Sequence, residues 1–171
     1  VDRLVDELWG ESPPESAVKT VQVYVSRLRK ELGDGVLLTQ RGGYVLDIEP
    51  GQLDAARFER LAADGRDALE RGDVRQAHAL LQDALDAWRG PPLADFAYDG
   101  FAQPDIARLD ELRLLTLEER IEADLALGRH SGVVPELETL VREHPARERL
   151  RAQLMLALYR SGRQADALAS Y

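Results

Sequence analysis

Cationic, hydroxyl and small apolar side chains recur along one face of the segment 16–32, at steps of three or four residues. At that spacing the side chains of a helix line up in one stripe. The stripe consists of Thr20, Val23, Tyr24, Arg27 and Lys30. Such a helix can enter the major groove of DNA, where Arg pairs with guanine edges and Val or Thr touches a thymine methyl. The spacing therefore predicts a DNA-reading helix, and a solvated helix face with scattered cations is the alternative that periodicity alone leaves open.

The edges of the stripe and the opposite face complete this helix. Lys19, Ser26 and Arg29 fall beside the stripe, where they are better placed for phosphates than for bases. The opposite face is apolar at positions i, i+4, i+7 and i+11, a pattern that predicts the side packed on a core. That face consists of Val21, Val25, Leu28 and Leu32. We therefore expect a helix that buries one side and presents its cations on the other.

A short cationic hairpin is predicted to follow the helix. Strands at 36–39 and 44–48 flank Gly42–Gly43, which is a two-residue turn signal. Thr39 and Arg41 precede this turn, and a cationic hairpin beside a groove-binding helix can reach a DNA backbone or a minor groove. A plain surface hairpin is the alternative that these residues leave open.

The cations of this segment belong to a chain with a formal net charge of −9. The segment 16–46 holds five Lys and Arg residues against two acids, a local balance of +3. Residues 50–171 hold 16 basic and 22 acidic residues, a balance of −6. DNA binding depends on the potential of the contacting face and not on the sum over the chain. The acidic total therefore does not exclude nucleic acid as a partner.

Other features of the sequence argue against metal, membrane and enzyme chemistry. The chain has no Cys, which excludes disulfides and thiolate metal sites and is consistent with a cytoplasmic location. His78, His130 and His144 lack the spacing of metal ligands. The apolar runs are too short to span a bilayer. No nucleotide-binding or nucleophile motif is present, and the adjacent acids Glu118–Glu119 are interpreted as a solvated helix face. We therefore expect no cofactor, no metal, no membrane contact and no enzymatic activity.

From residue 50 onward the chain changes to helices. Pro50–Gly51 marks the boundary, which predicts one domain over 1–49 and another over 50–171. Apolar periodicity predicts helices of the second domain at 55–71, 74–88, 105–127, 133–143, 147–160 and 164–171. The second domain is therefore expected to be all-α.

A repeat runs through this half of the chain. Gly128 and Gly162 fall in helix–helix turns 34 residues apart, and Leu137 and Tyr171 in the following helices share that separation. This is the period of tetratricopeptide helical hairpins. We therefore expect an array of antiparallel helix pairs. The aromatic loop of this half, with Trp88, Phe96, Tyr98 and Phe101, is interpreted as a hydrophobic joint in preference to a ligand pocket.

Several motifs, taken in order, resemble one known family. DRLVDELWG, TVQVYVSRLRKELG and LLTQRGGYVL resemble the end of the winged helix-turn-helix domain of bacterial response regulators. ALDAWRGPPLADF and the repeats that end in RSGRQADALASY resemble a bacterial transcriptional activation domain. The two together resemble the SARP family of antibiotic regulatory activators. The implied fold is mainly α, with a partial winged helix-turn-helix (helices plus a C-terminal β-hairpin) followed by an all-α, tetratricopeptide-like repeat domain. The chain is interpreted as a segment of a longer protein.

The resemblance also implies a function and a set of contacts. It implies a sequence-specific DNA-binding activator that binds promoter direct repeats, recruits RNA polymerase with its sigma factor, pairs as a homodimer and regulates secondary metabolism in the cytoplasm. The alternative is a helical-repeat interaction module whose winged helix contacts protein. Thr20, Val23, Tyr24 and Arg27 would face the groove. Lys19, Ser26 and Arg29 would lie at or near the DNA backbone, and Thr39 and Arg41 on the wing. Tyr24 stands where response regulators often have His, and Ser26 where some have Arg.

Overall fold

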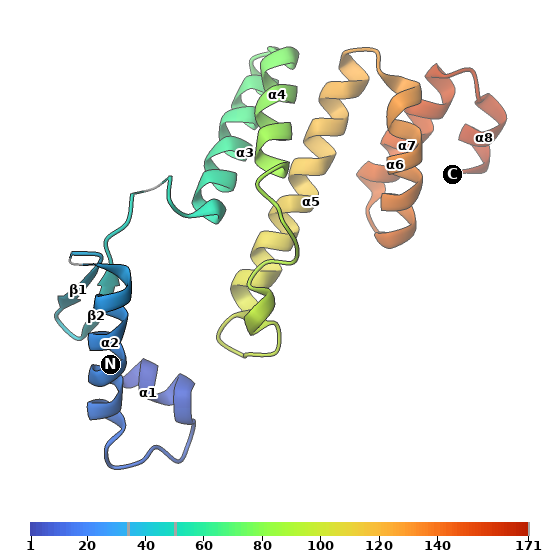
Figure 1. The fold of residues 1–171 in the computed structure, drawn as a ribbon. Helices are drawn as coiled ribbons and strands as arrows, with labels where there is room; N and C mark the ends of the chain where they lie inside the picture. The colour runs from blue at the N-terminus through green and yellow to red at the C-terminus, as the bar shows by residue number, and fades with distance from the viewer. Residues whose placement is uncertain (34, 50, 171) are drawn as a thin grey trace. The chain divides into compact units, whose positions relative to one another are not determined.

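The computed structural model describes residues 1–33, 35–49 and 51–170 (Figure 1). Contacts along the chain divide it into two compact units, Val1–Leu53 and Asp54–Tyr171. Pro50, where the sequence predicts a boundary, lies outside the described residues. Across the described ranges, no helix is both long enough and apolar enough to cross a membrane.

The first unit contains two helices and a hairpin. It is built from α1 (Asp2–Trp9), α2 (Ala17–Leu32), β1 (Leu37–Gln40) and β2 (Gly43–Leu46). α2 ends where Gly33 takes a left-handed φ of 91°. The small core joins all three parts and consists of Val5, Ala17, Val21, Val25 and Leu37. This order of elements is the predicted one.

The buried stripe of α2 differs from the prediction in its second half. Val21 and Val25 are buried, but Leu28 and Leu32 are 49% and 47% exposed. Because a four-residue step exceeds one turn, a row of such steps rotates slowly around the helix. Ala17, Val21 and Val25 follow that row and lead to Arg29, on the side where β1 packs. The prediction that Leu28 and Leu32 belong to the core was therefore wrong.

The hairpin turn lies one residue earlier than predicted. Gln40 pairs with Gly43 and Thr39 with Tyr44, so Arg41 and Gly42 form the two-residue turn in place of Gly42–Gly43. Within this turn Gly42 takes the left-handed conformation, with φ of 87°, which glycine adopts without a steric penalty. The shift places Arg41 at the tip of the hairpin.

The second unit is an array of helices joined by short turns, except for a long loop between α4 and α5 (Figure 1). Its elements are α3 (Asp54–Glu70), α4 (Val74–Leu85), the short 3-10 helix η1 (Ala94–Phe96), α5 (Gln103–Ala126), α6 (His130–Glu143), α7 (Glu148–Arg160) and α8 (Gln164–Ala169). α3 packs on α4, α4 on α5, α6 on α7, and α7 on α8. The turns at Gly128 and Gly162 have nearly equal φ angles, 79° and 81°. The predicted all-α array is confirmed, with helix ends displaced by up to three residues; Tyr171, the predicted counterpart of Leu137, lies outside the described residues.

The packing of α3 against Leu81 of α4 requires a glycine. A Cβ atom built on Gly65 would lie 2.7 Å from Cγ of Leu81, a fully buried side chain. The distance is far below van der Waals contact, so any larger residue would force Leu81 out of place. The sequence places Gly65 in the middle of a helix, where glycine is otherwise unfavourable.

We expect Gly65→Ala to lower the free energy of unfolding by about 1–2 kcal/mol. Overpacking costs about 1–3 kcal/mol, which outweighs the gain in helix propensity of about 1 kcal/mol. The control is Gly132→Ala in α6, where a Cβ meets nothing within 4 Å and stability should rise by up to about 1 kcal/mol. Urea unfolding of both variants measures the difference, and equal stabilisation by both would contradict the packing argument.

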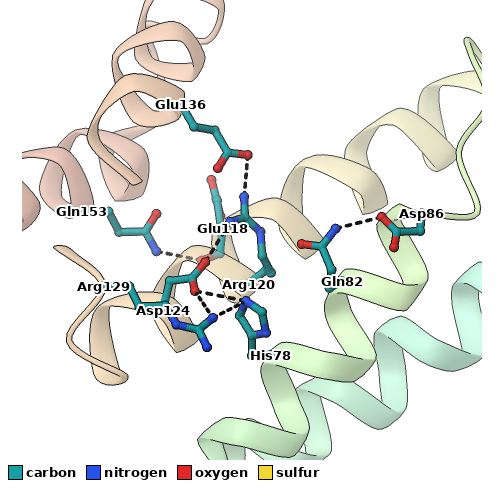
Figure 2. A network of polar contacts seen from close by, with 9 residues as sticks. All are labelled: His78, Gln82, Asp86, Glu118, Arg120, Asp124, Arg129, Glu136 and Gln153. Carbon is teal, nitrogen blue, oxygen red and sulfur yellow. Dashed lines mark hydrogen bonds and ion pairs between the residues drawn. The ribbon is translucent and has the colours of Figure 1, made fainter. Parts of the chain in front are cut away.

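A polar network fastens α5 to its neighbours (Figure 2). Asp124, which is 4% exposed, lies at its centre. Its Oδ2 accepts a hydrogen bond from Nη1 of Arg120 at 2.8 Å, and its Oδ1 accepts one from Nη1 of Arg129 at 3.0 Å. Nε2 of His78, on α4, lies 3.0 Å from the same Oδ1. Arg120 also pairs with Glu136 on α6. One carboxylate thus links α4, α5 and the turn into α6.

The acids Glu118 and Glu119 are buried, so their interpretation as a solvated face was wrong. Glu118 is 2% exposed, and burial raises its pKa. Glu119 accepts a hydrogen bond of 2.6 Å from Nε of Arg66 on α3, and this carboxylate raises the pKa of Arg66. α5 packs against α3 and α4 on one side and α6 and α7 on the other, and these helices cover the positions of both acids. Periodicity within one helix cannot show that both sides are covered.

The aromatic loop after α4 is only partly the predicted joint. Trp88 packs edge-on against Phe58, with ring centroids 5.3 Å apart. Phe96 and Phe101 contact one another at 5.6 Å but stay exposed, and Tyr98 is fully exposed. The loop runs along α5 (Figure 1), and its later aromatic residues are exposed. The prediction of a hydrophobic joint was therefore right for Trp88 and wrong for Phe96, Tyr98 and Phe101.

Candidate nucleic-acid interface

One face of α2 carries most of the predicted DNA-contacting residues, and it is exposed. Val23 is 47% exposed whereas Val21, two positions earlier, is 3% exposed, so the helix presents opposite faces to the core and to solvent. The free face carries Lys19, Val23, Tyr24, Ser26, Arg27 and Lys30, all exposed, with half-buried Thr20 at its edge. The structure thus brings the predicted groove-facing side chains together on one surface.

The cations of this surface are not engaged elsewhere. Among the residues that the structure describes, Lys19, Arg27, Lys30 and Arg41 form no ion pair and no side-chain hydrogen bond. An ammonium or guanidinium group without a protein partner is available to neutralise phosphates or to pair with base edges. α2 itself carries one acid, Glu31, against four basic residues. Its exposed face is therefore locally positive on an acidic chain.

Thr20 is partly engaged within its own helix. Its Oγ1 donates a hydrogen bond of 3.0 Å to the carbonyl of Ser16, one turn earlier. This back-bond fixes the hydroxyl proton and leaves the methyl group and an oxygen lone pair to face outward. Thr20 can therefore accept a hydrogen bond or contact a methyl group, but it has no proton to donate.

Arg29 differs most from its predicted place. Its Nε donates to the carbonyl of Leu37 at 2.8 Å, and its Nη2 donates to Oγ1 of Thr39 at 2.7 Å. Its guanidinium carbon lies 6.0 Å from the ring centroid of Tyr44. Two residues predicted to contact DNA, Arg29 and Thr39, are thus bonded to one another and fasten the hairpin to α2.

Sequence reasoning missed this fastening and the part played by Tyr44. The available signal was the row of four-residue steps Ala17, Val21, Val25 and Arg29, which puts the Arg at the end of the core stripe. An Arg in line with buried residues carries its donors into the packed region, where they need acceptors. Here the acceptors come from β1, and the register of the hairpin, which brings Tyr44 opposite Thr39, is set by the turn.

The wing carries a single cation at its tip. Arg41 is exposed in the turn between β1 and β2, while Thr39 pairs with Tyr44 two residues before the turn and accepts a hydrogen bond from Arg29. The bonds from Arg29 to Leu37 and Thr39 fix β1 relative to α2, and at the turn the carbonyl of Gly42 accepts a hydrogen bond of 2.6 Å from the amino group of Val1. The interface consists of the exposed face of α2 and the cationic tip of the hairpin.

The first unit has two helices joined by a turn, and a hairpin fastened to the second helix. These elements form the last part of a winged helix-turn-helix. The all-α array completes the architecture of a bacterial transcriptional activator. Residues 1–46 match the family described as transcriptional regulatory protein, C terminal, and residues 53–171 match the bacterial transcriptional activator domain. With both matches in this order, the chain belongs to the SARP family of transcriptional activators, as its motifs predict.

Relatives in two genera align with almost the whole chain. The chain is 44% identical to the regulatory protein DnrI of Streptomyces peucetius, over 100% of the chain and 67% of DnrI. It is 50% identical to the regulatory protein AfsR of Streptomyces coelicolor, over 98% of the chain and 17% of AfsR. The structure of Mycobacterium tuberculosis EmbR in complex with a low-affinity phosphopeptide superposes with a TM-score of 0.94 at 41% identity, over 99% of the chain and 46% of EmbR. The chain thus spans only part of the length of these relatives.

Proposed function

We propose that this activator binds double-stranded DNA sequence-specifically, with α2 in the major groove. The observation that carries the proposal is the exposed face of α2, where cations that have no partner among the described residues lie opposite the core. Thr20, Val23, Tyr24 and Arg27 would face base edges, with Lys30 farther along the same stripe. Lys19 and Ser26, at the edge of the stripe, would contact phosphates. The burial of Val21 and Val25 on the opposite side of α2 supports the choice of this face as the one that meets DNA.

The wing would contact the DNA beside α2. Arg41 at the hairpin tip would reach the adjacent backbone or minor groove. Arg29 and Thr39, which bond to one another, would act by holding the hairpin at a fixed angle to α2 and not by binding DNA directly. The proposal thus keeps the predicted wing contact for Arg41 and gives Arg29 and Thr39 a positioning role.

The intact activator would act on promoter direct repeats in the cytoplasm, at the nucleoid. Repeats about one helical turn apart, roughly 34 Å, would place two protomers on one face of the duplex. The helical array would recruit RNA polymerase with its sigma factor and pair the protomers as a homodimer. The regulated genes would belong to secondary metabolism, as membership of the SARP family of antibiotic regulatory activators suggests. The array offers an acidic surface to such partners.

The test is binding of the intact protein to its own upstream DNA, measured against salt. The affinity should fall steeply as salt rises, because bound cations release counterions from phosphates. Arg27→Ala should cost about 1–3 kcal/mol and relax the sequence preference at one position. Lys19→Ala should weaken all sequences alike and reduce the salt slope by about 1. Footprinting of the upstream region would give the repeat spacing.

Arg75→Ala is the matched control, because Arg75 is an exposed cation of α4 without an ion pair among the described residues. It should leave both affinity and salt slope unchanged. If Arg27→Ala and Lys19→Ala behave as this control does, the placement of α2 in the groove is wrong. The winged helix would then contact protein, and the chain would be a helical-repeat interaction module.

A further inference from the structure

A cavity of about 610 Å³ opens in the helical array between the start of α3, the loop after α4, and α5. Its floor is apolar and fixed. Trp88 packs edge-on against Phe58, and the guanidinium carbon of Arg113 lies 5.0 Å from the Trp88 ring centroid. Leu109 of α5 and the Gly90–Pro92 segment close the sides. Its volume lies within the range of ligand-binding pockets, which are concave and mostly apolar.

The loop that lines the cavity, and continues beyond it, carries large apolar side chains that are partly or fully exposed. Leu93 lines the cavity in a left-handed conformation, with φ of 49°, and is 43% exposed. Beyond it Phe96 and Phe101 contact one another and remain exposed, and Tyr98 is fully exposed. Exposed apolar side chains gathered around a cavity mark a surface that binds another molecule. The rim extends well past the cavity mouth, so a ligand that only filled the cavity would leave most of it in solvent.

The charge of this surface is negative. Asp95 lines the cavity and Asp99 follows in the same loop, and neither carboxylate forms an ion pair or a side-chain hydrogen bond among the described residues. The cation nearest in the lining, Arg89, is held by Asp54 at 2.7 Å. Arg113, over Trp88, is a cation that also has no ion pair among the described residues, but it belongs to α5. The uncompensated charges of the loop itself are the two carboxylates, and a partner complementary to the loop carries cations.

We propose that this surface, the aromatic rim with its cavity, docks a short segment of a partner protein. The segment has an apolar or aromatic anchor that enters the cavity, and Lys or Arg residues on either side that meet Asp95 and Asp99. The apolar floor selects the anchor, the carboxylates select its flanks, and the exposed aromatic side chains cover the segment beyond the anchor. The proposal concerns the helical array alone and does not depend on DNA binding.

The experiment uses a fluorescein-labelled peptide with a Leu-Trp-Leu centre and two Lys residues on each side, titrated with the intact protein and followed by fluorescence anisotropy. This peptide should bind. Peptides with Glu in place of Lys, or Ser in place of the apolar centre, should bind at least about tenfold more weakly. Absence of binding by the Lys-flanked peptide, or equal binding of all three, would overturn the proposal.

Variants of the protein locate the peptide. Asp95→Asn combined with Asp99→Asn should weaken binding about tenfold, because two charge pairs are lost. The matched control removes two exposed acids elsewhere in the array, Asp64→Asn with Glu143→Gln, and should change the affinity less than twofold. Equal weakening by both pairs would mean that the peptide follows the overall acidic charge, which would overturn the site.

A second pair of variants tests the cavity itself. Ala94→Trp places a bulky side chain in the lining and should abolish binding, whereas Ala63→Trp, on an exposed part of α3, should leave it intact. Circular dichroism confirms that both fold. Full displacement of the peptide by N-acetyltryptophanamide at an affinity equal to that of the peptide would make the cavity a small-molecule site and would overturn docking of a protein segment. None of these readouts uses DNA, so failure here leaves the DNA-binding proposal standing.

Discussion

Asp124→Asn is expected to lower the free energy of unfolding of the helical array by about 3 kcal/mol. The substitution keeps the shape of the side chain and removes its charge. Arg120, itself buried, then loses the carboxylate that lies 2.8 Å away and retains only Glu136. Removing one partner of a buried ion pair is costly because the remaining charge cannot regain its hydration. Denaturant unfolding followed by circular dichroism, with amide hydrogen exchange to assign the loss to α4–α6, measures the effect.

The matched control is an Asp–Arg pair in solvent. Asp166 lies 2.6 Å from Nε of Arg163, and both side chains are about half exposed. Asp166→Asn should change stability by less than about 0.5 kcal/mol, since water and salt screen exposed pairs. Replacing both buried partners, Arg120→Met with Asp124→Leu, should recover part of the loss. A similar small effect from Asp124→Asn and Asp166→Asn would show that the buried network does not hold the helices together.

Arg29→Ala is expected to loosen the hairpin by about 2 kcal/mol. Two hydrogen bonds from a charged donor are lost, and the carbonyl of Leu37 loses a partner in a half-buried position. Arg29→Lys should recover little, since an ammonium group cannot reproduce the two-armed geometry of the guanidinium. Amide hydrogen exchange at the paired residues of β1 and β2 reports the local opening free energy.

Arg27→Ala is the control for this prediction, because Arg27 lies on the same helix, is exposed, and has no partner among the described residues. Arg27→Ala should leave amide exchange in the hairpin unchanged while it weakens DNA binding. Arg29→Ala should speed amide exchange in the hairpin. It should also weaken DNA binding, because the loosened hairpin misplaces Arg41. If Arg29→Ala leaves hairpin exchange unchanged, the proposed positioning role fails and a direct phosphate contact becomes the better assignment.

The accuracy of the sequence-based predictions depended on whether a feature was local. The second helix, the hairpin and the helical array were predicted from spacing alone, because periodicity and turn residues act within a few positions. The exposed row with Val23 and Arg27 was predicted for the same reason. The turn was misplaced by one residue because both Gly42 and Gly43 are compatible with it, and only the pairing of Gln40 with Gly43 separates the two.

Features that depend on distant partners were missed. Leu28 and Leu32 have the spacing of core residues, but no element of the described first unit covers them. Glu118 and Glu119 have the composition of a solvent face, but α5 is packed on both sides. In each case the residue type and its spacing are compatible with both core and solvent. Residues far along the chain decide which of the two environments the side chain has.

By itself, the sequence determined the class of this protein: a winged helix with an exposed cationic face, followed by an all-α activator array. Residue type and spacing suffice for that, because helix faces and turns follow from local geometry. Only the tertiary structure decided which cations remain free. It ties Arg29 to the hairpin and leaves Arg27 and Arg41 without partners in the described chain. The physical reason is that a guanidinium bonds to whatever acceptor folding brings within about 3 Å, and that acceptor is not encoded near it in the sequence.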